Sequence, residues 1–217
     1  MHELTLVVGN RNYSSWSLRG WLVLQHSGLA FSTINLQLQA QEFATEVARY
    51  SPVGKVPVLL VAGEAIWDSL AIAEYLAEQQ PSLWPAATQA RARARSLCAE
   101  MHSGFMALRQ QMPMNLQARA RQVPMRPELA ADIARIEAIW QQTRQAFGAT
   151  GPWLFGDWSI ADAFFTPVAA RFRSYGVTLG AEAAAYQQTL LSDPALALWL
   201  AEGGDQGIIA DAEVGLA

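Results

Sequence analysis

The sequence predicts a two-domain protein in which an α/β domain is followed by an all-helical domain. Up to about residue 80, short apolar runs that suit β-strands alternate with helical patterns, whereas only helical patterns occur after residue 89. The stretch between them, residues 78–85 (EQQPSLWP), contains two prolines and no periodicity, which is typical of a linker. We therefore expect one domain at residues 1–80 and a second at residues 89–217.

In the α/β domain, compact apolar runs predict the strands and amphipathic patterns predict the helices between them. Serines mark the start of the first helix and Gly28 its end, because serine caps helix N-termini and glycine follows helix C-termini. The expected elements are a strand at 4–8, a helix from 13 to Gly28, a strand at 31–36, a helix at 41–49, strands at 58–62 and 65–67, and a helix from 70 onward. This order is that of a thioredoxin-like domain.

The second domain is expected to consist of helices and the loops between them. Proline and glycine mark the loops at 122–127 and 148–152. The expected helices are one long helix at 89–111, interrupted by Met112-Pro113, a second long helix at 128–147, a buried helix at 162–175, and two more at 181–191 and 194–203. Residues 204–217 are expected to form a loosely held tail.

The composition predicts a folded protein without a nucleic-acid or membrane partner. Hydrophobic residues make up 52% of the 217 residues, and the formal net charge is −4, which does not suit a polyanion or an anionic surface. No apolar run approaches the roughly 20 residues that span a bilayer. The single cysteine, Cys98, allows no intrachain disulfide, and we interpret it as a core thiol. The histidines lack metal-ligand spacing, so no metal is expected. Without a secretory signal, we expect a cytoplasmic location.

Two short motifs in the α/β domain predict a ligand site. In Lys55-Val56-Pro57, a cis bond before the proline would leave the Val56 main chain available to an extended, peptide-like ligand. Asp68-Ser69 stands at a helix start, which suits a ligand carboxylate, and the Asp68 side chain can take a ligand ammonium. Glutathione carries all of these groups. Each feature alone also has an ordinary explanation: a surface lysine, a trans proline at a strand start, and a helix cap.

These motifs resemble those of the cytosolic glutathione transferases. That family has a cis proline after a valine, an acidic residue or glutamine followed by serine at the next helix, and a Ser/Thr-x-x-Asp start to a central helix, here Ser159 to Asp162. The resemblance covers nearly the whole chain. It implies a detoxifying transferase that is a homodimer, uses glutathione as co-substrate, and binds it through Lys55, Val56, Asp68 and Ser69. The fold also hosts members that are not enzymes.

The segment Ser14–Arg19 is similar to that of serine-type classes such as zeta and tau, and related bacterial members. The resemblance implies that the Ser14 hydroxyl donates to the glutathione sulfur and favours the thiolate, because a free thiol has a pKa of about 8.5. The alternative is that all the serines are helix caps. We expect the helical turn to aim Ser15 and Ser17 away from the site. A thioredoxin-type redox enzyme is disfavoured, because no cysteine stands at this helix.

A second-substrate pocket is predicted along the first helix of the helical domain. On one continuous helix, Met101, His102, Phe105 and Arg109 can share a face, and Trp16 stands where zeta enzymes have cysteine. Zeta enzymes also use an arginine where this chain has Ser174, so isomerase activity of the maleylacetoacetate type is the lesser alternative. We predict a glutathione transferase acting on a small, largely apolar electrophile. A binding or interaction protein without catalysis is the other alternative.

Overall fold

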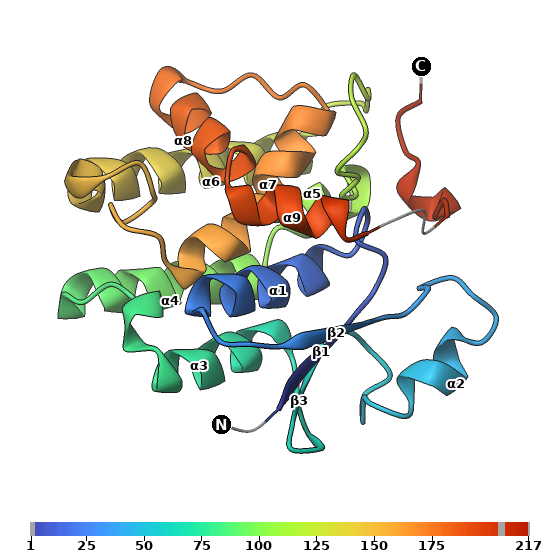
Figure 1. Cartoon of the computed structure of the whole chain (residues 1–217). Helices are drawn as coiled ribbons and strands as arrows, with labels where there is room; N and C mark the ends of the chain where they lie inside the picture. Colours follow the sequence, from blue (N-terminus) through green and yellow to red (C-terminus); the bar gives the residue numbers. More distant parts are fainter. Residues whose placement is uncertain (1–2, 204–206, 217) are drawn as a thin grey trace. The chain divides into compact units, whose positions relative to one another are not determined.

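The computed structural model describes residues 3–203 and 207–216. The chain forms two compact units (Figure 1): Met1–Leu83 together with Pro194–Ile209, and Trp84–Asp193 together with Ala210–Ala217. Within the described ranges, no helix has the length and apolar character that crossing a membrane requires.

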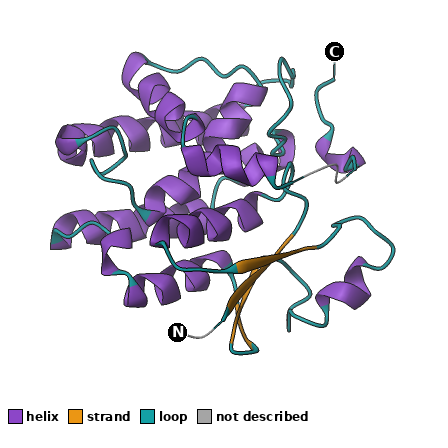
Figure 2. Cartoon of the chain, in the orientation of Figure 1, coloured by secondary structure: helices purple, strands orange, loops and turns teal. Residues whose placement is uncertain are grey.

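A four-stranded mixed sheet forms the centre of the first unit (Figure 2, orange). Its strands run in the order β2-β1-β3-β4, with β1 parallel to β2 and antiparallel to β3, and β3 antiparallel to β4. Their bounds are β1 Leu4–Val8, β2 Ser32–Asn35, β3 Val58–Val61 and β4 Glu64–Ile66. The two-residue period of β1 separates its faces: Val7 packs with Val47 of helix α2, whereas Leu6 approaches α1 at Gly20. The thioredoxin-like prediction is confirmed.

In the first unit, helix α1 (Ser15–Ser27) follows β1, α2 (Phe43–Val47) follows β2, and α3 (Ser69–Gln79) follows β4. α1 packs against α3 and ends, as predicted, at Gly28, which takes the left-handed conformation with φ 71°. The Val56–Pro57 bond is cis. A Cβ at Gly20 would lie 3.5 Å from the Pro57 ring, which is an ordinary van der Waals distance, so α1 packs directly on this turn. The expected linker carries a 3₁₀ turn, η1 (Pro81–Leu83).

Helix α9 (Pro194–Ala201) belongs to the first unit, whereas the sequence placed these residues in the second domain. α9 packs on α1, where the rings of Trp199 and Trp21 lie 5.4 Å apart. The Trp199 indole donates to the Arg11 carbonyl at 2.8 Å. The Arg11 guanidinium lies 4.5 Å from the Trp199 ring and 3.0 Å from Glu202. Contacts between residues so distant in sequence leave no local pattern, so the sequence could not place this helix.

The regular elements of the second unit are helices, as predicted. Helix α7 is buried along almost its whole length and contacts α4 and α8. The Trp140 ring packs against the rings of Phe165, Phe172 and Tyr186. The helices are α4 Thr88–Ser103, α5 Met106–Gln111, α6 Pro127–Phe147, α7 Ile160–Ser174 and α8 Ala181–Leu191, with 3₁₀ turns η2 Gly148–Thr150 and η3 Ala210–Ala212.

The single long helix expected at residues 89–111 is wrong, because the chain breaks between α4 and α5. Phe105 lies in the left-handed region with φ 60°, and Gly104 precedes it in extended backbone. The side chain of Arg109 reaches back and donates to the carbonyls of Gly104, at 3.0 Å, and Met101. A side chain thus satisfies the carbonyls that a continuous helix would have paired, and propensity alone could not reveal this exchange.

The loosely held tail expected at residues 204–217 is wrong for residues 207–216. Glu213 accepts hydrogen bonds from Asn115, at 2.8 Å, and from Arg121. The Gly215 carbonyl accepts from the Gln122 main chain at 3.0 Å. These contacts tie the end of the chain to the loop before α6. Residues 204–206 and 217 lie outside the described residues.

Candidate functional site

A pocket in the first unit gathers several of the residues that the sequence singled out. It has a volume of about 450 Å³, within the roughly 300–1,000 Å³ that small-molecule sites occupy. Lys55, Val56, Asp68 and Trp16 line it, and so do three further residues: Val53, Pro57 and Trp67. The sequence analysis missed Val53 and Trp67 as site residues. Both are large apolar side chains with high exposed fractions, 49% and 41%, which is a surface feature that no local pattern indicates.

The turn before β3 positions Lys55 and Val56. The Lys55 main-chain N–H donates to the Ser51 hydroxyl at 3.0 Å, and the Lys55 side chain remains exposed. The β1–β3 ladder ends at the pair Val7–Val58, so Val56 lies beyond it. In the described part of the chain, the Val56 main chain makes no hydrogen bond. Its donor and acceptor are therefore available to an extended ligand.

The start of α3 forms another wall of the pocket. Asp68 caps this helix, and its carboxylate accepts from the Leu70 N–H at 3.0 Å. The Ser69 side chain is fully buried, yet its hydroxyl has no hydrogen-bond partner among the described residues. A buried polar group without a partner is rare in a folded protein. Together with the free N–H groups of a helix start, it indicates a place for an acceptor such as a carboxylate.

Ser14 is the N-cap of α1 and is 7% exposed. Its oxygen accepts from the Ser17 N–H at 3.4 Å, and its hydroxyl donates to the Ser17 hydroxyl oxygen at 2.7 Å. The Gly9 N–H donates to the same Ser17 oxygen at 3.0 Å. Ser17 therefore lies beside Ser14, because the residue three positions after a cap returns to the cap's side. Ser17 is not among the described residues that line the pocket.

Asn10, which the sequence analysis did not select, fixes the loop that presents Ser14. Its carbonyl accepts from the Ser14 N–H at 2.8 Å and from the Tyr13 N–H at 3.1 Å. Its side chain donates to Gln37 at 2.7 Å and accepts from the Leu38 N–H at 2.7 Å. An asparagine in a predicted turn is the one signal that the sequence offered for this role.

A buried cation stands behind the pocket wall. The Arg19 side chain is 1% exposed, and its guanidinium lies 4.6 Å from the centre of the Trp16 ring. The two residues are three positions apart on α1 and therefore lie on the same side of the helix. Since Trp16 lines the pocket, Arg19 places positive charge one layer behind a ligand there.

His102 and Phe105, the residues predicted for a second-substrate pocket, lie in the second unit. His102 is on α4, whereas Phe105 is 7% exposed in the break before α5. The expected shared helical face with Arg109 is therefore wrong. Arg109 instead lies near Arg171 of α7, which donates to the Met112 carbonyl. Burial, and to a lesser extent the charge of Arg109, lower the pKa of Arg171 to about 9.

Comparisons with known proteins assign the family. A glutathione S-transferase N-terminal domain model matches residues 13–79. Rat maleylacetoacetate isomerase is 30% identical over 174 residues, 78% of each chain. A probable maleylacetoacetate isomerase of Caenorhabditis elegans is 34% identical over 100 residues, 45% of this chain and 46% of that protein. A glutathione transferase homologue from Burkholderia was solved with bound glutathione and superposes with a TM-score of 0.69 at 24% identity. The superposition covers 94% of this chain and 98% of the Burkholderia chain.

The chain belongs to the glutathione S-transferase family. Among the curated relatives, its similarity is to the maleylacetoacetate isomerases, which fits the zeta-like sequence around Ser14.

Proposed function

We propose that this protein is a glutathione transferase that activates the glutathione thiol for attack on a small, largely apolar electrophile. The observation that carries the proposal is the pocket in which Lys55, Val56 and Asp68 meet, beside the buried, unpartnered hydroxyl of Ser69. Relatives and structural neighbours are glutathione-dependent enzymes or contain glutathione, which supports glutathione as the co-substrate.

Each ligand group has a counterpart in the pocket. The Val56 main chain pairs with the peptide-like middle of glutathione, as an edge strand pairs with an added strand. Ser69 and the N–H groups of the α3 start receive one carboxylate, and Asp68 takes the ammonium. The exposed Lys55 ammonium faces the second carboxylate. Opposite charges at the two ends of the pocket therefore fix the direction in which the tripeptide lies.

Ser14 then acts on the thiol. Its hydroxyl turns from Ser17 to the glutathione sulfur and donates to the thiolate, while the thiol proton leaves to solvent. The thiolate attacks the electrophilic carbon, a C–S bond forms, and the leaving group departs or the adduct takes up a proton. A shift of two units in the thiol pKa requires about 2.7 kcal/mol, which is within reach of one or two hydrogen bonds to a charged group.

Glutathione-dependent isomerisation of a small unsaturated carboxylate is the second candidate. The observation that favours it is that the curated relatives that match are maleylacetoacetate isomerases. In such a reaction, the thiolate adds to the double bond, the bond rotates, and the thiolate is expelled. Glutathione is regenerated, so no adduct accumulates.

The test is glutathione binding followed by a turnover screen over halides, epoxides, enones, peroxides and cis-dienoates. Conjugation of an apolar halide, epoxide or enone supports the transferase, and isomerisation of a cis-dienoate without adduct supports the second candidate. Binding without any turnover would indicate a non-catalytic binding protein. Lys55→Met should weaken glutathione binding, whereas Arg49→Met, which removes an exposed cation outside the pocket, should not. Absence of glutathione binding would overturn the proposal.

We further propose that the protein is a cytoplasmic homodimer, as the family resemblance implies. Sedimentation at micromolar concentration should show twice the chain mass of 23.7 kDa. A monomer in that experiment would contradict the dimer, and recovery of the protein outside the cytoplasmic fraction would contradict the location.

A further inference from the structure

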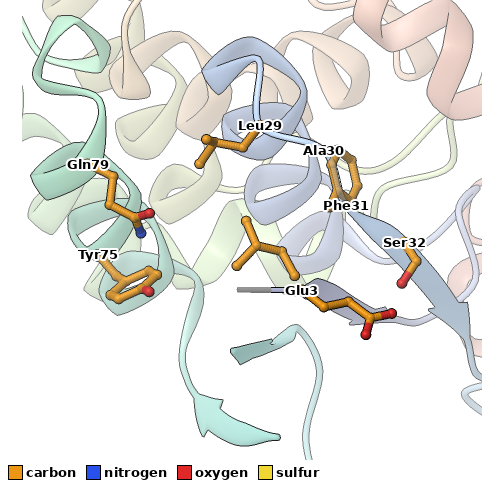
Figure 3. A pocket seen from close by; sticks show the side chains of 8 residues that line it. Glu3, Leu29, Ala30, Phe31, Ser32, Tyr75 and Gln79 are labelled. Atoms are coloured by element: carbon orange, nitrogen blue, oxygen red, sulfur yellow. The ribbon is translucent and has the colours of Figure 1, made fainter. Parts of the chain in front are cut away.

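A second pocket of about 490 Å³ lies in the first unit, away from the one described above. It forms where β1 begins, where α1 connects to β2, and along the last turns of α3 (Figure 3). The two pockets share no lining residue. The lining residues of the second pocket are Glu3, Leu4, Leu29, Ala30, Phe31, Ser32, Tyr75 and Gln79. We propose that this pocket binds a small amine with an apolar, preferably aromatic, body.

The walls of the pocket are fixed by the fold. α1 ends at Gly28, and the chain then turns through Leu29 into β2. The Phe31 ring is held edge-on against Trp21, with the ring centres 6.2 Å apart. On the α3 side, Tyr75 and Gln79 are four residues apart and lie on one face of the helix, toward the hollow in Figure 3.

Three polar groups of the lining remain available to a ligand. The Ser32 hydroxyl already pairs with the Thr5 hydroxyl at 2.8 Å. In contrast, the side chains of Glu3, Tyr75 and Gln79 have no hydrogen-bond partner in the described part of the chain. They offer a carboxylate, a phenol and a carboxamide, all of which can accept a hydrogen bond.

The charge and the apolar walls define the class of ligand. Among the described residues that line this pocket, Glu3 is the only charged one, and its charge is negative, so a cation is favoured and an anion such as glutathione is repelled. Leu4, Leu29 and Phe31 offer apolar surface to the body of the ligand. The Tyr75 and Phe31 rings add faces that attract an ammonium. The volume, within the roughly 300–1,000 Å³ of small-molecule sites, suits one aromatic amine.

Calorimetric titration of the full chain with three matched probes tests this inference: phenethylamine, 2-phenylethanol and 3-phenylpropionate. We expect saturable binding of the amine and no saturation by the acid. Because Glu3 is exposed, the neutral alcohol should bind only about three- to fivefold more weakly than the amine. Saturation with glutathione should leave amine binding unchanged, because the two pockets are separate.

Variants show whether the binding is in this pocket. Glu3→Gln should remove the preference for the amine over the alcohol, and Leu29→Trp, which fills the hollow, should weaken all binding. Glu64→Gln, which neutralises an exposed carboxylate on β4 outside the pocket, is the matched control and should change nothing. Equal binding of all three probes, no saturable binding of the amine, or an amine preference that survives Glu3→Gln would overturn the inference. None of these outcomes bears on glutathione transfer.

Discussion

Helices α1 and α7 both begin with a serine cap, but the residue three positions later differs. In α7 it is Asp162, whose carboxylate accepts from the Ser159 N–H at 2.8 Å and from the Ser159 hydroxyl at 3.1 Å. In α1 it is Ser17, a neutral hydroxyl that pairs with Ser14, and the first turn contains no acidic residue. The positive end of α7 therefore has its own anion, whereas that of α1 does not.

The surroundings of the two caps extend this difference. Asp162 is fully buried and also accepts from the Leu154 N–H at 3.0 Å and from the Tyr186 hydroxyl at 2.8 Å. Burial raises the pKa of Asp162 to about 6, although these hydrogen bonds favour its charged form. The hydrogen bonds of Asp162 at the start of α7 thus go to groups of the chain itself, which indicates a role in stability. The first turn of α1 contains no such anion, so under the proposed function its positive end would act on the glutathione thiolate.

The largest effect is expected from Asp162→Ala. It leaves the buried N–H of Leu154 and the buried hydroxyl of Tyr186 without an acceptor and removes half of the capping box. Losses of this kind add to about 3–4 kcal/mol of unfolding free energy, more than the roughly 1 kcal/mol of a cap alone. Urea denaturation should show the loss, with turnover per folded molecule unchanged. Asp157→Ala, an exposed carboxylate before the same helix, is the control. Normal stability with lost turnover in Asp162→Ala would instead assign Asp162 a role in catalysis.

The pH dependence of that stability is the second test. The pKa of Asp162 is about 6 in the folded chain and 3.8 without the protein environment, so the folded state holds a proton between these values. The contribution of Asp162 to the free energy of unfolding is therefore full below pH 3.8. It falls as the pH rises toward about 6 and is lost above that pKa, by up to about 3 kcal/mol in all. The destabilisation by Asp162→Asn should shrink as pH rises across this window and then level off. A difference that stays constant with pH would show that Asp162 is not buried as described.

Local patterns predicted the elements well. The bounds of β1 at Leu4–Val8 and of α8 at Ala181–Leu191 agree with the sequence-based expectation. Gly9-Asn10 ends the first run, and Gly180 and Ser192-Asp193 flank the second. The capping box at Ser159 also agrees with it, since its partner is only three residues away. Features that depend on distant partners were missed. Examples are the packing of Trp199 on Arg11 and the hydrogen bond from Asn115 to Glu213.

The candidate site divides in the same way. Lys55, Val56 and Asp68 belong to short motifs, and the structure brings them to one pocket. Trp67 and Val53 line that pocket only because the folded chain leaves them exposed there. The pairing of Ser14 with Ser17 depends on side-chain orientation, for which residue type gives no signal. The sequence motifs therefore predicted which residues line the pocket better than they predicted how individual side chains are oriented.

Ser14→Ala tests whether the Ser14 hydroxyl at the start of α1 activates the glutathione thiol. Because the proposed function assigns glutathione binding to the Val56 main chain and the charged groups, the affinity for glutathione should change by no more than a few fold. The conjugation rate at pH 7 should fall roughly tenfold to a hundredfold, equivalent to about 1.4–2.7 kcal/mol. The midpoint of the pH–rate profile should rise toward about 8.5, the value of a free thiol. Ser15→Ala is the matched control and should change neither quantity. An unaltered pH profile in Ser14→Ala would move the activating role to another group.

The smallest effect, and the one that separates the two hydroxyls, is expected from Ser17→Ala. In the structure, the Ser14 hydroxyl donates to the Ser17 oxygen. Under the proposed function, Ser17 would compete with the glutathione sulfur as the acceptor of that hydroxyl, so removing Ser17 would free the donor. The pH–rate midpoint should then move down by about 0.3 unit, a twofold gain in thiolate below the midpoint, opposite in sign to Ser14→Ala. The Gly9 N–H loses its acceptor as well, which should cost about 1 kcal/mol of stability.

The double variant with Ser14→Ala should have the pH profile of Ser14→Ala alone, because Ser17 acts only through Ser14. If Ser17→Ala instead raises the pH–rate midpoint as far as Ser14→Ala does, Ser17 donates directly to the glutathione sulfur. The activating hydroxyl would then lie one helical turn after the Ser14 cap.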